Sequence, residues 1–384
     1  MDFEVDDSDD SIRETVAAIT RSFGPSYYSE HATRYEATED LWRELGKQGF
    51  IGINLPEQYG GGGAGLRELV LVCEETAAQG APLLLMLVSA AISGELISRY
   101  GSDAQKATWL PRMATGESKV VFAITEPDAG SNTLKMSTVA VRDEQGWLLT
   151  GSKYYISGVD EADAILVVAK TGNTDVTGKA LLSLFLVPTD APGLVVQRLP
   201  VSVPLPERQF TLFFDNVRLT DENLIGTEDE GFAEVFHGLN PERIVGAAIC
   251  VGVGRFVLAK AAEYARTREV WGVPIGSHQG VSHALAKAEI EVELAALMTS
   301  KAAWLHDHGQ PAGEASNMAK YAAAEAASAA VDAAIQTHGG NGLSSEYGLI
   351  PLWGIVRLLR IAPVSREMIL NYVAQHSLGL PRSY

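Results

Sequence analysis

The chain has 384 residues, of which 46% are hydrophobic, and its formal net charge is −18. This length suggests two or three domains, and the composition is typical of an ordinary soluble globular protein with a large core. The negative charge argues against nucleic acid or an anionic membrane as the main partner, although a local basic pocket could still bind an anionic small molecule.

Residues 1–120 are predicted to form a helical domain. Apolar residues recur at helical spacing in DLWRELGKQGFIGINLP (40–56), and the run 66–101 is rich in alanine and leucine and largely free of helix breakers. Between these segments, QYGGGGAGL is predicted to be a flexible loop. It is not a phosphate-binding loop, because it lacks the following Lys-Ser/Thr pair and a preceding strand.

Residues 121–230 change to a β pattern. Short segments rich in β-branched and aromatic residues are separated by Gly, Asp, Asn and Pro, which predicts an all-β, barrel-like domain. The expected strands are GWLLTGSKYYISG (146–158), ADAILVVAKT (162–171), ALLSLFLVPTD (180–190), GLVVQRLPV (193–201) and RQFTLFFDNVRL (208–219).

Residues 231–384 are predicted to form a four-helix bundle. The expected helices are 231–239, 241–268, 279–309 and the alanine-rich segment from Ala315 to His338, whose alanines lie on nearly every face. In the second of these, Asn240 suits an N-cap and Pro241 suits the first helical position. On local grounds Glu242 would then complement the positive end of the helix dipole.

Two segments of the β region carry side chains suited to a ligand. In FAITEPDAGSN (122–132), Thr125, Ser131 and the backbone donors near them could bind a polar ring or a carbonyl group, although an elaborate turn is an equal alternative. In GSKYYISG, Tyr155 and Ser157 are expected on one face of a strand as an aromatic platform beside a hydroxyl, although ordinary strand patterning is the better explanation of this segment taken alone.

Two further segments lie at helix ends. TREVWGVPIGSHQG (267–280) contains Arg268, Trp271 and Gln279, which suit charge pairing, stacking and amide recognition, or simply a polar turn. QTHGGNGLSSE (336–346) joins Gln336 to glycines that permit close approach of a phosphate or ribityl group. It is not a GxGxxG motif after a strand, so a Rossmann fold is not predicted.

The cysteines and histidines do not indicate a metal site or a disulfide framework. Cys73 and Cys250 both lie in apolar helical segments, and His306 and His308 form a lone H-D-H pair that is typical of a polar helix end. We see no signal peptide and no apolar run of membrane length, so we expect a cytoplasmic protein.

A series of segments occurs in an order that resembles the acyl-CoA dehydrogenase family over nearly the whole chain. These segments are LGKQGFIGINLPEQYGG, YGSDAQKATWLPRMATGES, AITEPDAGSN, GSKYYISG, FFDNVRLTDENLIGTEDEGF, TREVWGVPIGSHQ and QTHGGNGLSSE. The resemblance implies an N-terminal helical domain, a middle β domain and a C-terminal helical bundle, in agreement with the pattern described above.

The resemblance also implies a cofactor site for FAD. The positions that match flavin contacts are Phe122, Ile124, Thr125, Tyr155 and Ser157. The positions that match further FAD contacts, partly across a subunit interface, are Arg268, Trp271, Ile275, His278, Gln279, Gln336 and Gly340. Ser131 and Arg243 are expected at the substrate. A shared FAD site implies at least a homodimer, and the family norm is a tetramer.

The implied reaction is α,β-dehydrogenation of an acyl-CoA thioester to the trans-2-enoyl-CoA. A carboxylate removes the proton from Cα and the flavin accepts a hydride from Cβ. An electron-transfer flavoprotein is the implied electron acceptor. The base must be desolvated enough to raise its pKa, because an ordinary glutamate is too weak.

The position of the commonest catalytic base departs from the family pattern. In IAPVSREMI (361–369), Pro363 stands where most members carry glutamate, Val364 replaces glycine, and Ser365 replaces threonine but keeps a hydroxyl for FAD. Pro363 has neither a carboxylate nor an N–H, so a neighbour such as Val364 or the flavin ribityl hydroxyl must stabilise the enolate oxygen. Glu367 is an alternative base.

A second segment resembles the minority of the family that includes the isovaleryl-CoA and long-chain enzymes. These enzymes carry the base on the helix after the β domain, and LNPERIV places Glu242 at that position. The resemblance therefore implies Glu242 as the base. Two other functions stay open: a flavin oxidase or monooxygenase, and a catalytically silent subunit that binds acyl-CoA or FAD. The preferred acyl group is not evident from the sequence.

Overall fold

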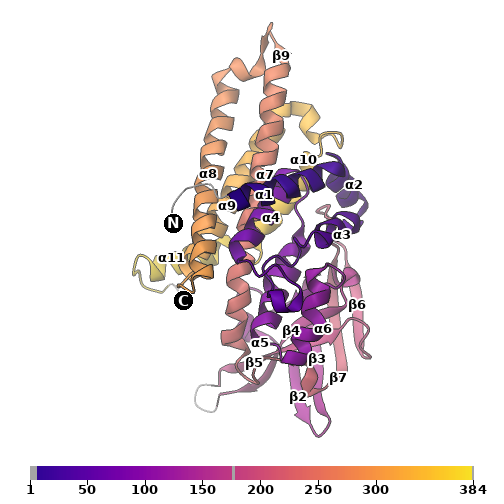
Figure 1. The fold of residues 1–384 in the computed structure, drawn as a ribbon. Helices are drawn as coiled ribbons and strands as arrows, with labels where there is room; N and C mark the ends of the chain where they lie inside the picture. The colour runs from indigo at the N-terminus through magenta and orange to yellow at the C-terminus, as the bar shows by residue number, and fades with distance from the viewer. Residues whose placement is uncertain (1–6, 175–177, 383–384) are drawn as a thin grey trace.

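The computed structural model describes residues 7–174 and 178–382. An N-terminal group of helices is followed by a β-sheet and then by long helices, which confirms the predicted fold class. Figure 1 shows the sheet at one end of the molecule. The long helices α7 and α8 form a hairpin whose tip, marked by β9, lies at the opposite end.

The N-terminal helices are shorter than the sequence pattern indicated. The helix predicted over 40–56 stops at Lys47, and Gly49 follows with a positive φ of 80°. The run 66–101 is interrupted at Gly80, whose φ of 87° is incompatible with a continuing helix. The helices are α1 (Asp7–Ser22), α2 (Tyr27–Arg34), α3 (Glu39–Lys47), η1 (Glu57–Tyr59), α4 (Leu66–Ala78), the π-helix η2 (Met86–Gly94), α5 (Glu95–Tyr100) and α6 (Asp103–Ala114).

Side-chain caps fix the starts of two of these helices. Ser102 and Gln105 form a reciprocal capping box at the start of α6, with bonds of 3.2 and 2.7 Å. At the start of α4, the backbone N–H groups of Leu66 and Arg67 donate to the carboxylate of Asp307 over 2.8 and 2.9 Å. Because Asp307 is the last residue of α8, this cap ties the N-terminal helices to the C-terminal ones.

Within the described residues, eight strands form one sheet with the order β6-β7-β3-β2-β4-β5-β8, and β1 pairs with β4. Three of them, β1, β2 and β8, were not among the predicted strands. The strand β1 is four residues long and fully buried, so it has no alternating pattern. The strands are β1 (Val120–Ala123), β2 (Val139–Asp143), β3 (Gly146–Ser157), β4 (Ala164–Asn173), β5 (Ala180–Pro188), β6 (Leu194–Leu199), β7 (Gln209–Leu219) and β8 (Leu224–Ile225).

The C-terminal part is built around α7, which packs against α4, α8 and α9. Small residues allow this close packing: a side chain at Gly252 would lie only 2.1 Å from the carbonyl oxygen of Glu74 in α4. The helices are α7 (Gly231–Thr267), α8 (Gln279–Asp307), α9 (Gly313–His338), α10 (Leu349–Ile361) and α11 (Arg366–His376). Between α7 and α8 lies the two-stranded β9 (Glu269–Val270) and β10 (Val273–Pro274). The short 3-10 turns are η3 (Thr133–Lys135), η4 (Val159–Glu161), η5 (Asp221–Asn223), η6 (Ile275–Ser277) and η7 (Gly339–Leu343).

The helix α7 also corrects an expectation about membrane spans. Contrary to the prediction that no apolar run reaches membrane length, it is long and apolar enough to cross a membrane by length and composition. However, 78% of its most apolar window is buried inside the fold, and the core helix of a soluble protein passes the same test. The cytoplasmic location stays a prediction.

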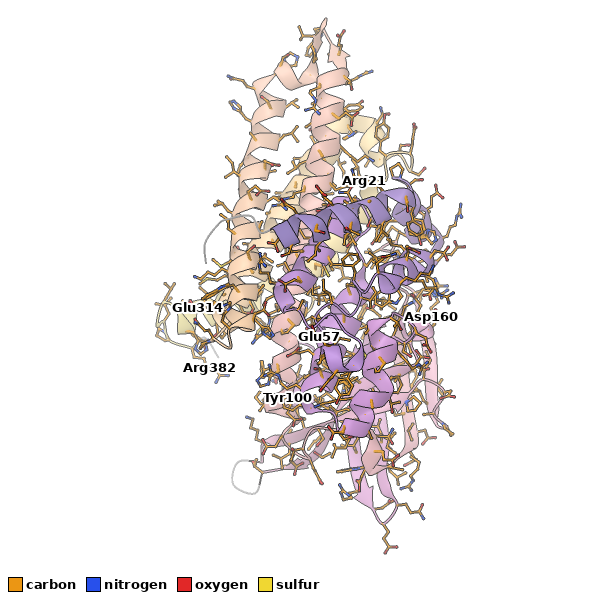
Figure 2. All side chains as sticks on the ribbon, viewed as in Figure 1. Arg21, Glu57, Tyr100, Asp160, Glu314 and Arg382 are labelled. Carbon is orange, nitrogen blue, oxygen red and sulfur yellow. The ribbon has the colours of Figure 1, made fainter. Side chains whose placement is uncertain are left out.

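Side chains join the separate parts close to where they meet. The Tyr100 hydroxyl on α5 lies 2.6 Å from Nδ1 of His237 on α7. Asp160, after β3, forms an ion pair with Arg208, before β7. Figure 2 labels Tyr100 and Asp160 near the boundary between the N-terminal helices and the sheet. These links fix the first turns of α7, which precede Glu242, and the end of β3, which carries Tyr155 and Ser157.

Candidate active site

Glu242 lies in the interior of a helix and not at its start. The helix α7 begins at Gly231, so the predicted N-cap at Asn240 and first helical position at Pro241 were wrong. A proline inside a helix removes one backbone hydrogen bond, but buried side chains on both sides of it, including Val235 and Ile244, keep the helix continuous. The dipole interpretation of Glu242 fails as a result, because the dipole acts within the first turn.

The Glu242 carboxyl group is buried and incompletely paired. Its side chain is 8% exposed, and Oε2 has no hydrogen-bond partner among the described residues. Burial raises the pKa of Glu242 to about 8, while the positive charges of Arg243 and Lys320 act in the opposite direction. A desolvated carboxylate with a pKa near neutrality has the properties of a general base.

Arg243, the next residue, is buried beside this carboxyl group. Its Nη1 donates to Oδ1 of Asn240 over 2.9 Å, and its Nε has no partner among the described residues. Burial lowers the pKa of Arg243, and the negative charge of Glu242 and the hydroxyl of Tyr372 on α11 oppose this effect. The expected substrate residue is therefore a close electrostatic neighbour of Glu242.

The segment 361–365 follows α10 and leads into α11. The ammonium group of Lys320, on α9, donates to the carbonyl of Val364 over 2.5 Å and to that of Arg360 over 3.2 Å. Ser365 is the N-cap of α11, where its hydroxyl accepts a bond from the N–H of Met368. Glu367, the alternative base, lies in the first turn of α11 and is exposed.

The sheet brings together the first group of expected flavin contacts. Phe122 is buried at the end of β1, and Ile124 and Thr125 follow it, partly exposed. The carbonyl of Thr125 accepts a bond of 2.9 Å from the N–H of Tyr154 on β3. The two signature segments, AITEP and GSKYYISG, are therefore in direct contact. Ser131 lies farther along the first segment and is exposed.

The end of β3 is irregular, which the sequence pattern did not predict. A register shift relative to β7 falls between Lys153 and Ile156, and Tyr155 has a positive φ of 58°. The Tyr155 side chain is 55% exposed, which is unusual for a large aromatic ring. Ser157 is half-buried and exchanges hydrogen bonds with the side chain of Gln209 on β7. An exposed ring and a fixed hydroxyl group thus lie at one end of the sheet.

A buried ion pair joins the two signature segments. Lys153 is fully buried, and its Nζ donates to the carboxylate of Glu126 over 2.9 Å and to the carbonyl of Ile124 over 3.0 Å. Glu126 also accepts bonds from Ser137 and Thr138. Burial alone would raise the pKa of Glu126, but Lys153 and these donors lower it to about 2. Sequence reasoning did not identify this pair.

The second group of expected FAD contacts lies around the tip of the α7–α8 hairpin. Arg268 follows α7, Trp271 is 89% exposed between β9 and β10, and Gln279 begins α8. The Nε2 atom of His278 is buried without a hydrogen-bond partner among the described residues. Gln336 is exposed near the end of α9. A pocket of about 380 Å³ is lined by Tyr264, Arg268, Val270, Ile275, Thr337, His338, Gly339, Gly340 and Asn341.

The chemistry of this pocket fits the phosphate and adenosine parts of FAD. Arg268 supplies a positive charge, and a side chain added at Gly340 would meet no atom within 4 Å, so the backbone is open to a ligand. The exposed ring of Trp271 and the unpartnered nitrogen of His278 offer stacking and hydrogen bonding. The isoalloxazine part would meet Thr125, Tyr155 and Ser157 at the sheet.

The two groups of FAD contacts do not meet within one chain. Figure 1 shows β3 in the sheet at one end of the molecule and β9 at the tip of the hairpin at the other end. Apart from Phe122, the residues of both groups are at least partly exposed. One chain therefore presents two separate partial sites.

Comparison with known proteins identifies the parts of the chain. Residues 6–117 match the acyl-CoA dehydrogenase N-terminal domain, residues 121–217 the middle domain, and residues 229–378 the C-terminal domain. These three matches together span nearly the whole chain.

Similar proteins and structures give the same picture. The chain is 56% identical over 376 residues to the acyl-CoA dehydrogenase FadE12 of Mycobacterium tuberculosis, with 97% of each chain covered. The structure of butyryl-CoA dehydrogenase from Megasphaera elsdenii superposes with a TM-score of 0.92 at 26% identity, covering 98% of this chain and all of that one. The FAD complex of PigA superposes with a TM-score of 0.91, also at 26% identity, covering 99% and 100%.

Proposed function

Because this chain belongs to the acyl-CoA dehydrogenase family, and is a flavin-dependent oxidoreductase that uses FAD and acts on acyl-CoA, we propose that Glu242 is its catalytic base. The observation that carries this proposal is the buried Glu242 carboxyl group with an unpartnered Oε2. At the position where most family members carry the base, this chain has Pro363, which cannot accept a proton.

The chemistry of Glu242 follows from its surroundings. The carboxylate removes the proton from Cα of the acyl thioester, and Oε2 is the free oxygen atom that can accept it. FAD, when bound, accepts the hydride that leaves Cβ, and the product is the trans-2-enoyl-CoA. Burial of Glu242 excludes water, so the carboxylate is a stronger base than an exposed glutamate. The positive charges of Arg243 and Lys320 lower the pKa of Glu242 and so increase the ionised fraction of its carboxyl group.

The alternative base is less suitable because of its position. Glu367 is exposed in the first turn of α11, so its carboxyl group is open to water. Removal of the α-proton of a thioester needs a base that is shielded from water, as Glu242 is. Glu367 therefore serves as the matched control for Glu242.

We further propose that the protein works as a homo-oligomer, at least a dimer and by the family norm a tetramer. The two partial FAD sites, one on the sheet and one at the hairpin tip, support this proposal, because a second copy could join the hairpin tip of one chain to the sheet of another. A second support is the face of α8 that carries Ile290, Leu294 and Leu297, which are 61%, 61% and 50% exposed. Their spacing places them on one side of the helix.

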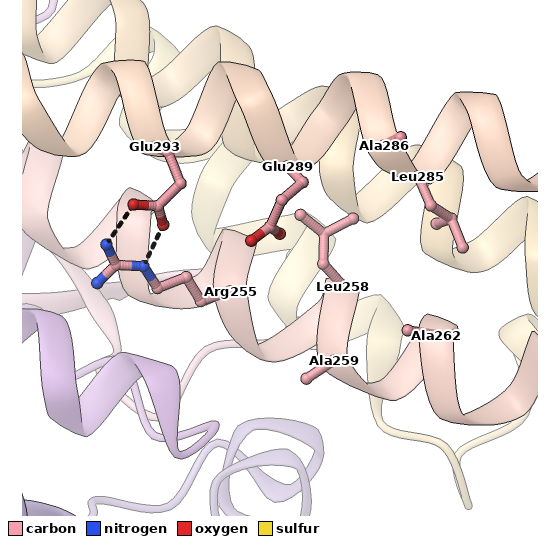
Figure 3. Close-up of a pocket in the computed structure, with 8 residues that line it drawn as sticks. All are labelled: Arg255, Leu258, Ala259, Ala262, Leu285, Ala286, Glu289 and Glu293. Carbon is pink, nitrogen blue, oxygen red and sulfur yellow. Dashed lines mark hydrogen bonds and ion pairs between the residues drawn. The ribbon is translucent and has the colours of Figure 1, made fainter.

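A groove between α7 and α8 lies beside this face of α8. It is lined by Arg255, Leu258, Ala259, Ala262, Leu285, Ala286, Glu289 and Glu293, and Figure 3 shows Arg255 paired with Glu293 at one end of it. Apolar surface of this kind favours contact with another protein surface.

We also propose an electron-transfer flavoprotein as the acceptor of the electrons, on the family resemblance alone.

Anaerobic reduction of the flavin by acyl-CoA, followed by stopped-flow absorbance, tests the assignment of the base. A panel of straight and branched acyl-CoA thioesters first identifies a substrate that reduces the wild-type protein. E242Q should retain FAD and bind that substrate but reduce the flavin more than roughly 100-fold more slowly, since the general base is lost. E367Q should reduce it at nearly the wild-type rate. Reduction of E242Q at the wild-type rate would show that Glu242 is not the base.

A further inference from the structure

Lys320 is a buried cation whose charge acts on Glu242 and whose hydrogen bonds reach a second segment of the candidate site. It lies on α9, within an otherwise alanine-rich stretch, and its side chain is 2% exposed. Burying an ammonium group is costly unless it is hydrogen-bonded or near a negative charge. Two of its bonds go to main-chain carbonyls, those of Arg360 at 3.2 Å and Val364 at 2.5 Å. These carbonyls lie at the end of α10 and in the segment 361–365.

The charged and titratable groups that act on Lys320 come from two helices. They are Glu242, Arg243 and Cys250 on α7 and Glu325 on α9. Cys250 is neutral near pH 7, because burial raises the pKa of its thiol to about 12.

Glu325 is already paired, since Arg360 donates to both of its oxygens over 2.6 and 2.8 Å. The remaining carboxyl group is that of Glu242, whose Oε2 has no hydrogen-bond partner among the described residues.

We propose that Lys320 is a positioning residue for the Glu242 base: its hydrogen bonds hold the segment 361–365, and its positive charge favours the ionised form of Glu242. This inference rests on the proposed role of Glu242. It explains why a lysine occupies a site that would otherwise suit alanine. Lys320 donates hydrogen bonds to the segment in which Pro363 replaces the usual base, and the positive charge of the same side chain acts on Glu242. The electrostatic effect has the required sign, because Lys320 lowers the pKa of Glu242.

Three substitutions separate the two roles of Lys320. K320Q keeps amide N–H donors for the carbonyls of Val364 and Arg360 but removes the charge. K320M removes both, and K320R keeps the charge. Lys260 is a matched control. It is also a partly buried lysine, and it donates to the main-chain carbonyl of Tyr347 over 2.7 Å. The carboxylate that acts on Lys260 is that of Glu263 and not that of Glu242.

The first measurement is independent of turnover. The infrared absorption of the protonated Glu242 carboxyl group, identified as the band that E242Q lacks, is titrated against pH in the oxidised FAD-bound protein. K320Q and K320M should raise the pKa of Glu242 by about one unit, which is about a tenfold smaller ionised fraction near neutral pH. K320R and K260Q should leave this pKa close to the wild-type value.

The second measurement is flavin reduction by acyl-CoA as a function of pH. K320Q should reduce the flavin about tenfold more slowly at pH 7, and raising the pH should restore the rate, because only the ionised fraction of Glu242 has changed. Its KM should stay near that of the wild type. K320M should also raise KM, because the segment 361–365 is no longer held.

Each outcome decides between the roles. An unchanged Glu242 titration in K320Q would overturn the proposal and leave Lys320 a structural residue. If K320M does not fold, K320Q and K320R still carry the test. If E242Q reduces the flavin normally, the proposed function fails, while the infrared titration still shows whether Lys320 acts on Glu242.

Discussion

Replacing Glu242 by glutamine should stabilise the protein, and the gain should grow with pH. Burial raises the pKa of Glu242 from an ordinary value of 4.5 to about 8. The folded state therefore binds this proton more tightly than the unfolded state. The stability that this proton contributes is complete below the ordinary pKa and is lost as the pH rises towards 8. E242Q carries no titrating group at this position, so it avoids the loss.

The size of the effect follows from the shift. A change from 4.5 to about 8 corresponds to about 5 kcal/mol, reached in full above pH 8, and to about 3 kcal/mol at pH 7. At pH 4.5 the wild type and E242Q should have nearly equal free energies of unfolding, because Glu242 is protonated in the fold. Catalysis and stability therefore make opposite demands on this residue.

Urea unfolding followed by circular dichroism, at fixed protein and FAD concentrations, measures this difference at pH 5, 7 and 9. E367Q is the control, because Glu367 is exposed and its substitution should change the free energy of unfolding little at any of these pH values. A difference between E242Q and the wild type that stays constant from pH 5 to 9 would refute the reasoning. It would mean that the Glu242 carboxyl group is well solvated or fully paired in the folded protein.

Two further predictions concern the FAD site. K153M should lower the free energy of unfolding by about 3–5 kcal/mol, because it leaves the buried Glu126 carboxylate unpaired. K153M should also weaken FAD retention on gel filtration. K287M, at an exposed lysine, should change neither the free energy of unfolding nor FAD retention. An FAD affinity equal to wild type in K153M would show that the ion pair does not position the flavin segments. For the shared site, the variants T125R and R268E should each be defective in FAD binding alone. When the two variants are unfolded together and reassembled, about a quarter of the FAD sites should be recovered. Half of the randomly formed dimers contain one copy of each variant, and each such dimer has one intact site out of two. No recovery in the mixture would argue against a site completed by a second copy.

The fold could be predicted from the sequence because its signals are long and local. The alternation of short β-branched segments and the helical period of α8 and α9 both agree with the structure. Helix ends were less predictable. Local capping preferences indicated a helix start at Asn240, but buried contacts on both sides of Pro241 kept α7 continuous. The strand β1 has no alternation, since both of its faces are buried.

The candidate site was only partly visible in the sequence. Glu242 could be found from LNPERIV and from the proline at the usual position of the base. Lys153 and Lys320 could not, because each is a single lysine in a segment whose pattern indicates an ordinary strand or helix. Their importance arises from partners distant in the chain, Glu126 for one and Val364 for the other. A single lysine within an alanine-rich helix is the only trace of Lys320 in the local sequence, and it does not show that the side chain is buried.

The sheet that carries Tyr155 and the hairpin tip that carries Trp271 are separate parts of one chain (Figure 1), so a site shared between copies would make FAD occupancy depend on protein concentration. If one copy contributes the sheet and another the hairpin tip, cofactor binding and subunit association share one free energy. On dilution the FAD should dissociate together with the subunits, and added FAD should hold them together at concentrations where the apoprotein separates. A cell that makes little of the protein would then hold mostly apoprotein, even with ample FAD.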